Sequence, residues 1–228
     1  MSIFNKFKVN KNANNNIELA LQVCNYYHGG LVSPSYTYQV QRFINRYGSK
    51  KDSLIAAINL CGNPITPKQL YIVSTCYVLA GASYRPQAIE FLNKYINVGA
   101  VWEGTPRSNI IIDGYTINQL NINKASVYCD LGKAYEGEYQ FDDALMSYFH
   151  SLKCDPSYTP AISYSADVYV KKNLIDSGLN FLKNFRKSPF KDVRLIASEK
   201  TKELKDKKSK GYVYKPRKRK KDTTVSQP

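Results

Sequence analysis

The sequence predicts an all-α protein, an α-solenoid built from stacked antiparallel helix hairpins. Three observations support this fold class. Apolar residues recur at spacings of three and four through most of the 228 residues, which is the period of an amphipathic helix. Glycine and proline residues interrupt these stretches at short intervals, as expected for helices joined by tight turns. An internal period of 34 residues in the C-terminal half indicates repeated hairpins.

The N-terminal region, 17–98, is predicted to form helical hairpins. Residues 1–16 are polar and rich in Asn and Lys, and we interpret them as a flexible leader. The predicted helices cover 17–28, 34–47, 52–60, 66–81 and 85–96. Gly29-Gly30, Gly48 and Gly62 end helices, while Ser33-Pro34 and Thr66-Pro67 are start signals, each a cap residue followed by proline.

Residues 99–121 break the helical pattern. This stretch contains Gly104, Pro106 and a β-branched run that leads into Asp113-Gly114. Asp-Gly between apolar residues is a signal for a two-residue hairpin turn. We therefore expect an insertion near 99–121 that is a loop or a small hairpin. Helices resume near residue 122 and continue in pairs to about 185, and a last helix covers 191–210.

In the 34-residue period, a small residue recurs where the first unit has a small residue, and a bulky residue recurs where it has a bulky one. The pairs are Gly132 with Ala166, Tyr135 with Tyr169, Ala144 with Gly178, and Tyr148 with Leu182. Two antiparallel helices approach closely only where a side chain is small. The sequence therefore predicts that Gly132 and Ala144 mark a helix crossing, and it places Ser147 on the exposed face.

Segment 125–158 resembles one repeat of the tetratricopeptide repeat (TPR) family. Leu131-Gly132 followed by Tyr135 matches the family's Leu-Gly-x-x-Tyr, and Ala144, Tyr148 and Pro156 match its later positions. Segment 159–192 resembles a degenerate copy, and a weaker unit lies near 68–97. An ordinary helical bundle remains the alternative. A domain of repeats and a terminal helix is expected over 122–204.

The resemblance implies a concave surface lined by the first helix of each pair, which binds a protein or peptide partner. Carried over from the family's positions, the expected groove residues are Ser126, Cys129, Lys133, Glu136, Ser163, Asp167 and Val170. This mixed set differs from the Lys/Asn-rich clamp that some members use for a C-terminal carboxylate. The predicted function is a protein-binding scaffold.

A basic tail is predicted over 205–228. The net charge is +15, and about half of the excess lies after residue 198, where 12 basic residues face 4 acidic ones. The candidate phosphate-binding residues are Lys215, Arg217, Lys218, Arg219, Lys220 and Lys221. Basic clusters beside Tyr212 and Tyr214 suit a nucleic acid. The alternative function is thus a nucleic-acid-associated regulator, while an acidic partner or a merely solvated terminus stays open.

No enzyme, cofactor or metal site is expected. The sequence has no phosphate-binding, nucleophile-elbow or zinc-protease motif and only two histidines. Cys24 and His28, with His150 and Cys154, would make a zinc ligand set, but the histidines are 122 residues apart and we interpret all four as core residues. The five cysteines are expected to be free thiols. No apolar run suits a signal peptide or a membrane span, so a cytoplasmic protein is expected.

Overall fold

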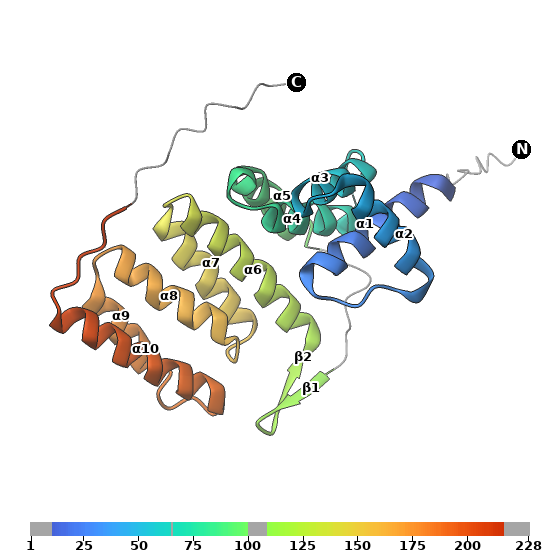
Figure 1. The fold of residues 1–228 in the computed structure, drawn as a ribbon. Helices are drawn as coiled ribbons and strands as arrows, with labels where there is room; N and C mark the ends of the chain where they lie inside the picture. The colour runs from blue at the N-terminus through green and yellow to red at the C-terminus, as the bar shows by residue number, and fades with distance from the viewer. Residues whose placement is uncertain (1–10, 65, 100–108, 217–228) are drawn as a thin grey trace, which may run out of the picture.

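The computed structural model describes residues 11–64, 66–99 and 109–216. Within these ranges the chain forms ten α-helices, two short 3-10 helices and one two-stranded sheet (Figure 1). The elements in order are α1 Lys11–His28, η1 Pro34–Tyr36, α2 Thr37–Tyr47, α3 Lys50–Leu60, α4 Pro67–Ala80, η2 Ala82–Tyr84, α5 Arg85–Asn97, β1 Asn109–Ile112, β2 Tyr115–Asn118, α6 Gln119–Gly137, α7 Phe141–Cys154, α8 Thr159–Lys171, α9 Ile175–Lys183 and α10 Lys191–Ser209. The predicted fold, helices packed in adjacent pairs with a small hairpin insertion, is confirmed.

Helix α1 begins earlier than the sequence predicts. It starts at Lys11 rather than at residue 17, so residues 11–16 of the expected flexible leader are helical. Residues 13–16 are exposed. A helical turn without buried side chains lacks the regular spacing of apolar residues from which a helix is predicted. Residues 1–10 of that leader lie outside the described residues.

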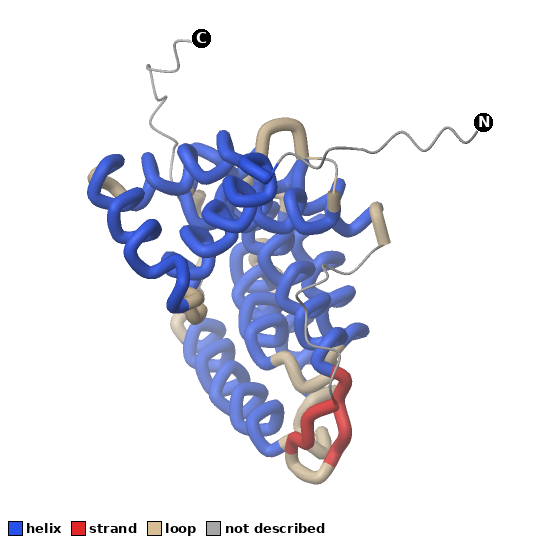
Figure 2. Tube along the Cα trace, turned by 90° about the vertical axis from the view of Figure 1, so that its right-hand side faces the viewer, coloured by secondary structure: helices blue, strands red, loops and turns tan. Residues whose placement is uncertain are grey.

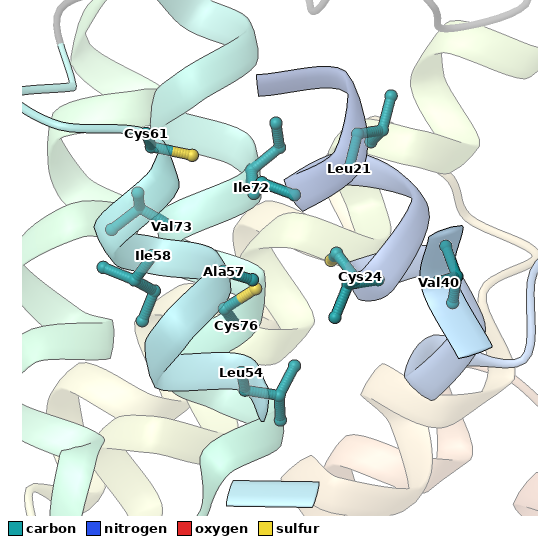
Figure 3. Packing of buried hydrophobic residues seen from close by; sticks show 12 residues of the cluster. Leu21, Cys24, Val40, Leu54, Ala57, Ile58, Cys61, Ile72, Val73 and Cys76 are labelled. Atoms are coloured by element: carbon teal, nitrogen blue, oxygen red, sulfur yellow. The ribbon is translucent and has the colours of Figure 1, made fainter. Parts of the chain in front are cut away.

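The N-terminal core forms where α1 packs against α3 and α4. Its fully buried side chains include Val23, Leu54 and Ile72. Three cysteines lie in the same core, Cys24 on α1, Cys61 after α3 and Cys76 on α4 (Figure 3). Small sulfur-containing side chains thus fill the space between these helices as ordinary apolar residues do.

The start of α4 follows the expected cap. The Thr66 hydroxyl accepts the backbone N–H of Gln69 at 3.3 Å, and the Gln69 side chain accepts the N–H of Thr66 at 3.1 Å. These reciprocal bonds are a capping box. Gln69 also donates to the carbonyl of Cys61 at 2.8 Å, which fixes the connection between α3 and α4.

The insertion contains the hairpin that Asp113-Gly114 predicts. Strands β1 and β2 pair antiparallel, and both turn residues have positive φ, 49° and 80°. This is the conformation of a two-residue type I′ turn. The hairpin lies beyond the ends of the helices, at the bottom of the view in Figure 2. There the Asp113 carboxylate accepts the backbone N–H of Lys191 at 2.6 Å, and Tyr115 packs on Phe190, so the insertion touches the start of α10.

Helices α6 to α9 form the two predicted hairpins, with no strand between residues 122 and 185. A Cβ atom on Gly132 would lie 2.5 Å from a ring carbon of Tyr148, so α6 and α7 cross at this glycine as expected. Ala144 is also completely buried. The expectation for Ser147 is wrong, because it is only 5% exposed and its hydroxyl donates to the carbonyl of Asp143. The neighbouring Met146 is the exposed residue.

Candidate binding face

Helices α6, α8 and α10 end with the same backbone turn. Just beyond each helix one residue has a positive φ: Tyr139 at 63°, Asn173 at 58° and Gly211 at 61°. The next residue donates its N–H to the carbonyl five positions back, over 2.9, 2.8 and 3.0 Å respectively. This is the closing bond of a Schellman motif. Tyr139 and Asn173 are 34 residues apart, so the period seen in the side chains is also present in the backbone.

The chain continues differently beyond the third of these turns. A second helix begins after α6 and after α8, whereas residues 212–216 after α10 are extended. Helix α10 packs on both α8 and α9. It is therefore the first helix of a third unit, and the described residues include no second helix for it.

We call the surface shared by α6, α8 and α10 the first-helix face. The three helices are neighbours in contact and lie roughly side by side (Figure 1). Two ion pairs cross between them: Glu136 on α6 with Lys171 on α8, and Asp167 on α8 with Lys200 on α10 at 2.7 Å. Lys133 on α6 also lies 5.7 Å above the ring of Tyr164 on α8. Polar and aromatic side chains thus connect each first helix to the next.

On this face, Lys200 and Glu203 are each paired with opposite charges. Burial alone would lower the pKa of Lys200, but hydrogen bonds to Asp167 and Glu203 raise it above its ordinary value. Hydrogen bonding from Lys207 lowers the pKa of the Glu203 carboxyl against the opposite effect of its burial. Both groups therefore stay charged at neutral pH. Partly exposed pairs of this kind contribute about 0–1 kcal/mol each to stability, so they position side chains more than they hold the fold.

Five of the predicted groove residues can be placed at or near this face. Lys133 is exposed, and Glu136 and Asp167 form the cross-helix pairs. Glu136 also accepts the hydroxyl of the buried Tyr148 at 2.7 Å, which ties the face to the core. Ser126 and Ser163 are half-buried, and Ser126 hydrogen-bonds the hydroxyl of Tyr158.

Two of the predicted groove residues are wrong. Cys129 is 2% exposed and packs with Ala144 and Tyr148, while Val170 is 4% exposed and packs with Leu182. The TPR resemblance assigns these positions to the groove, but in this structure the neighbouring helices cover both side chains. Neither side chain can touch a partner in this structure.

Three further residues of this face, Tyr164, Lys171 and Lys200, are not among those predicted from the sequence. A usable signal exists, because Lys171 follows Glu136 by 35 residues and Lys200 follows Asp167 by 33. Opposite charges separated by about one repeat period fall side by side on successive first helices. Opposite charges at about this separation in the sequence therefore indicate stacked helices, as recurring small residues do.

The first residues of the predicted basic tail lie in the last helix, as the expected helix over 191–210 implies. Helix α10 continues to Ser209, and Lys208 pairs with Asp176 on α9 at 2.5 Å, so residues 205–209 belong to the packed domain. The extended segment beyond it returns along the row of closing turns. The backbone N–H of Tyr214 donates to the Asn173 side chain at 2.7 Å, and its ring lies 6.3 Å from that of Phe141. Of the predicted tail residues Lys215 is exposed, and 217–221 lie outside the described residues.

The four candidate metal ligands are not brought together as a metal site. Cys24 lies in the N-terminal core, whereas His150 on α7 stacks on Tyr128 at 5.3 Å. Among the residues that the structure describes, no group of three His, Cys, Asp or Glu side chains is arranged to hold a metal ion. The same residues include no helix that is long and apolar enough to cross a membrane.

Comparison with known proteins finds similarity to solved structures, among them a TPR protein. No family model matches the chain, and no curated protein sequence matches it. The crystal structure of a thermophilic TPR protein from Thermus thermophilus is 17% identical over 82% of this chain and 98% of that one, with a TM-score of 0.39. A score of this size does not establish a shared family, and the fold assignment depends on the helix pairs themselves.

Proposed function

We propose that this protein is a TPR-like scaffold that binds a protein or peptide partner through its first-helix face. The observation that carries this proposal is the row of three first helices, α6, α8 and α10, which end in the same turn and are joined by cross-helix ion pairs. Stacked hairpins of this kind present an extended surface on which a peptide can lie across several helices.

The chemistry of the face suits a polar, mixed-charge segment. Asp167, Glu136 and their lysines compensate one another. The ammonium group of Lys133 is exposed, and it lies 3.8 Å from the Asp130 carboxylate and beside the ring of Tyr164. A carboxylate on the partner could pair with Lys133, and an aromatic residue could pack near Tyr164. The absence of a catalytic constellation from the sequence agrees with a binding role rather than with an enzyme.

The test is affinity capture of partners from native cells with the full chain, carried out with and without nuclease. We expect discrete proteins to be retained by the wild type and largely lost with Lys133→Glu, which reverses the exposed charge on the face. The matched control is Lys153→Glu, an equally exposed lysine on the second helix α7. Equal loss with both variants, or loss of all captured proteins after nuclease treatment, would overturn the proposal.

A further inference from the structure

The cations on and beside α10 fall into two groups. Lys200, Lys207, Lys208 and Lys210 each form an ion pair with a carboxylate. Lys187, Lys191 and four others make no ion pair with any carboxylate in the described ranges. The four others, Arg186, Arg194, Lys202 and Lys205, line a pocket. All four are exposed.

This basic pocket has a volume of about 580 Å³ and is lined by Arg186, Arg194, Ser198, Thr201, Lys202 and Lys205. Its α10 residues recur at helical spacing and therefore share one side of the helix. From residue 194 to residue 205 that side is about 16 Å long, at a rise of about 1.5 Å per residue. Arg186 reaches the pocket from the connection between α9 and α10.

Part of the pocket is held in place before any ligand arrives. Nη1 of Arg194 donates to the carbonyls of Ser188 and Pro189, both at 2.7 Å, which orients its guanidinium group. The Thr201 hydroxyl donates to the carbonyl of Ala197 at 2.7 Å, and this residue is buried beneath the pocket. An oriented guanidinium flanked by exposed ammonium groups suits oxygen atoms of an anionic ligand.

The lining indicates the class of that ligand. It contains four cations, two hydroxyl residues, no carboxylate and no large apolar side chain. Protein–protein interfaces are depleted in lysine at their centre and depend on buried aromatic or apolar anchors, which this pocket lacks. A nucleic acid backbone needs only positive charge placed along its phosphates, which on duplex DNA recur about every 3.4 Å along each strand. We propose that the basic pocket is a binding site for the phosphate backbone of a nucleic acid.

This site is separate from the first-helix face. Lys200 faces α8 through Asp167, whereas Lys202, two residues further along α10, is exposed and lines the pocket. The two surfaces can therefore be altered independently. The proposal adds a nucleic-acid contact to the proposed scaffold and does not depend on it.

The experiment measures binding of the full chain to a fluorescent single-stranded oligonucleotide of about 16 nucleotides over a series of salt concentrations. The pocket variant R194Q/K202Q/K205Q removes three charges. We expect it to bind at least about tenfold more weakly near physiological salt, and the slope of log affinity against log salt to fall by about 2. The charge-conserving variant R194K/K202R/K205R should retain most of the wild-type slope.

The matched control is R46Q/K50Q/K51Q, which removes three exposed cations around α2 and α3. Each of them lies over a tyrosine ring, and none forms an ion pair with a carboxylate of the described residues. We expect this control to change affinity by less than about twofold, because these charges lie far from the pocket along the helical stack (Figure 1).

Equal weakening by the two triple variants would show that only net charge matters. Unchanged binding by the pocket variant would place the contact elsewhere. A larger loss of binding to poly-glutamate or to phosphatidylserine vesicles than to the oligonucleotide would show that the ligand class is wrong. Each of these results overturns the proposal.

Discussion

Helices α6 and α7 meet across a glycine, whereas α1, α3 and α4 meet across side chains that range from alanine to isoleucine. A Cβ atom on Gly132 would overlap the ring of Tyr148, so the C-terminal crossing excludes every side chain at that position. In the N-terminal core Val23, Leu54 and three cysteines fill the space between helices. Close approach forces a small residue at a fixed register, while a wider contact accepts many residues.

The comparison explains why the repeat is visible in only one region. Gly132 and Ala166 occupy equivalent positions 34 residues apart, and both are buried. The equivalent backbone turns recur at the same interval. Helices α1 to α4 do not follow this pattern, and their small residues do not recur at a fixed interval.

The largest expected effect tests whether the two regions unfold as separate units. Tyr148 and Leu54 are completely buried in their respective cores. Tyr148→Ala should cost about 3–5 kcal/mol and Leu54→Ala about 2–5 kcal/mol. Native-state hydrogen exchange should accelerate mainly in α6–α10 for the first and in α1–α4 for the second, because stacked units contact mainly their neighbours. Uniform acceleration by both would show one cooperative unit.

A second prediction concerns the close crossing. Ala144→Leu should lower the free energy of unfolding by about 1–3 kcal/mol, because no space exists for the added carbons. The control is Met146→Leu, at a side chain that is 61% exposed, which should change stability by less than about 0.5 kcal/mol. Urea denaturation measures both, and similar values would mean that the crossing is placed wrongly.

A third prediction, with a smaller expected effect on stability, tests whether the end of α10 packs on the domain or behaves as a tail. Ending the chain after Leu204 removes the Lys208–Asp176 pair and the hydrogen bonds between Asn173 and Tyr214. It should destabilise the domain by about 1–2 kcal/mol. Asn173→Gly keeps the positive φ of the turn but loses the side-chain amide, and should cost about half as much. A melting temperature unchanged by the truncation would restore the tail boundary that the sequence predicts.

The smallest expected effect concerns the thiols. Burial raises the pKa of Cys61 in the N-terminal core and of Cys129 in the C-terminal core to about 12. Near pH 8 both are protonated, and thiolates are the reactive species, so a disulfide reagent should modify the half-buried Cys154 first. Zinc chelation should leave the melting temperature unchanged. Rapid modification of Cys61 in the native protein, or a lower melting temperature after chelation, would contradict this description of the cores.

Side-chain size and period predicted most of the fold. The turn at Asp113-Gly114, the capping box at Thr66 and the crossing at Gly132 follow from local chemistry, and the structure contains all three. Local patterns failed where a residue's exposure depends on distant elements. Cys129 and Ser147 have the spacing of surface positions but are covered by other helices.

The sequence by itself determined that helices form, where they turn and which small residues let two of them cross, because these depend on contacts within about one repeat. Only the tertiary structure decided which charges are compensated. It pairs Lys200 with Asp167 and leaves Lys202 exposed beside Arg194, although both lysines lie on one short stretch of α10. A charge in the sequence has no partner until folding brings distant helices together, and that pairing separates the proposed protein-binding face from the proposed nucleic-acid site.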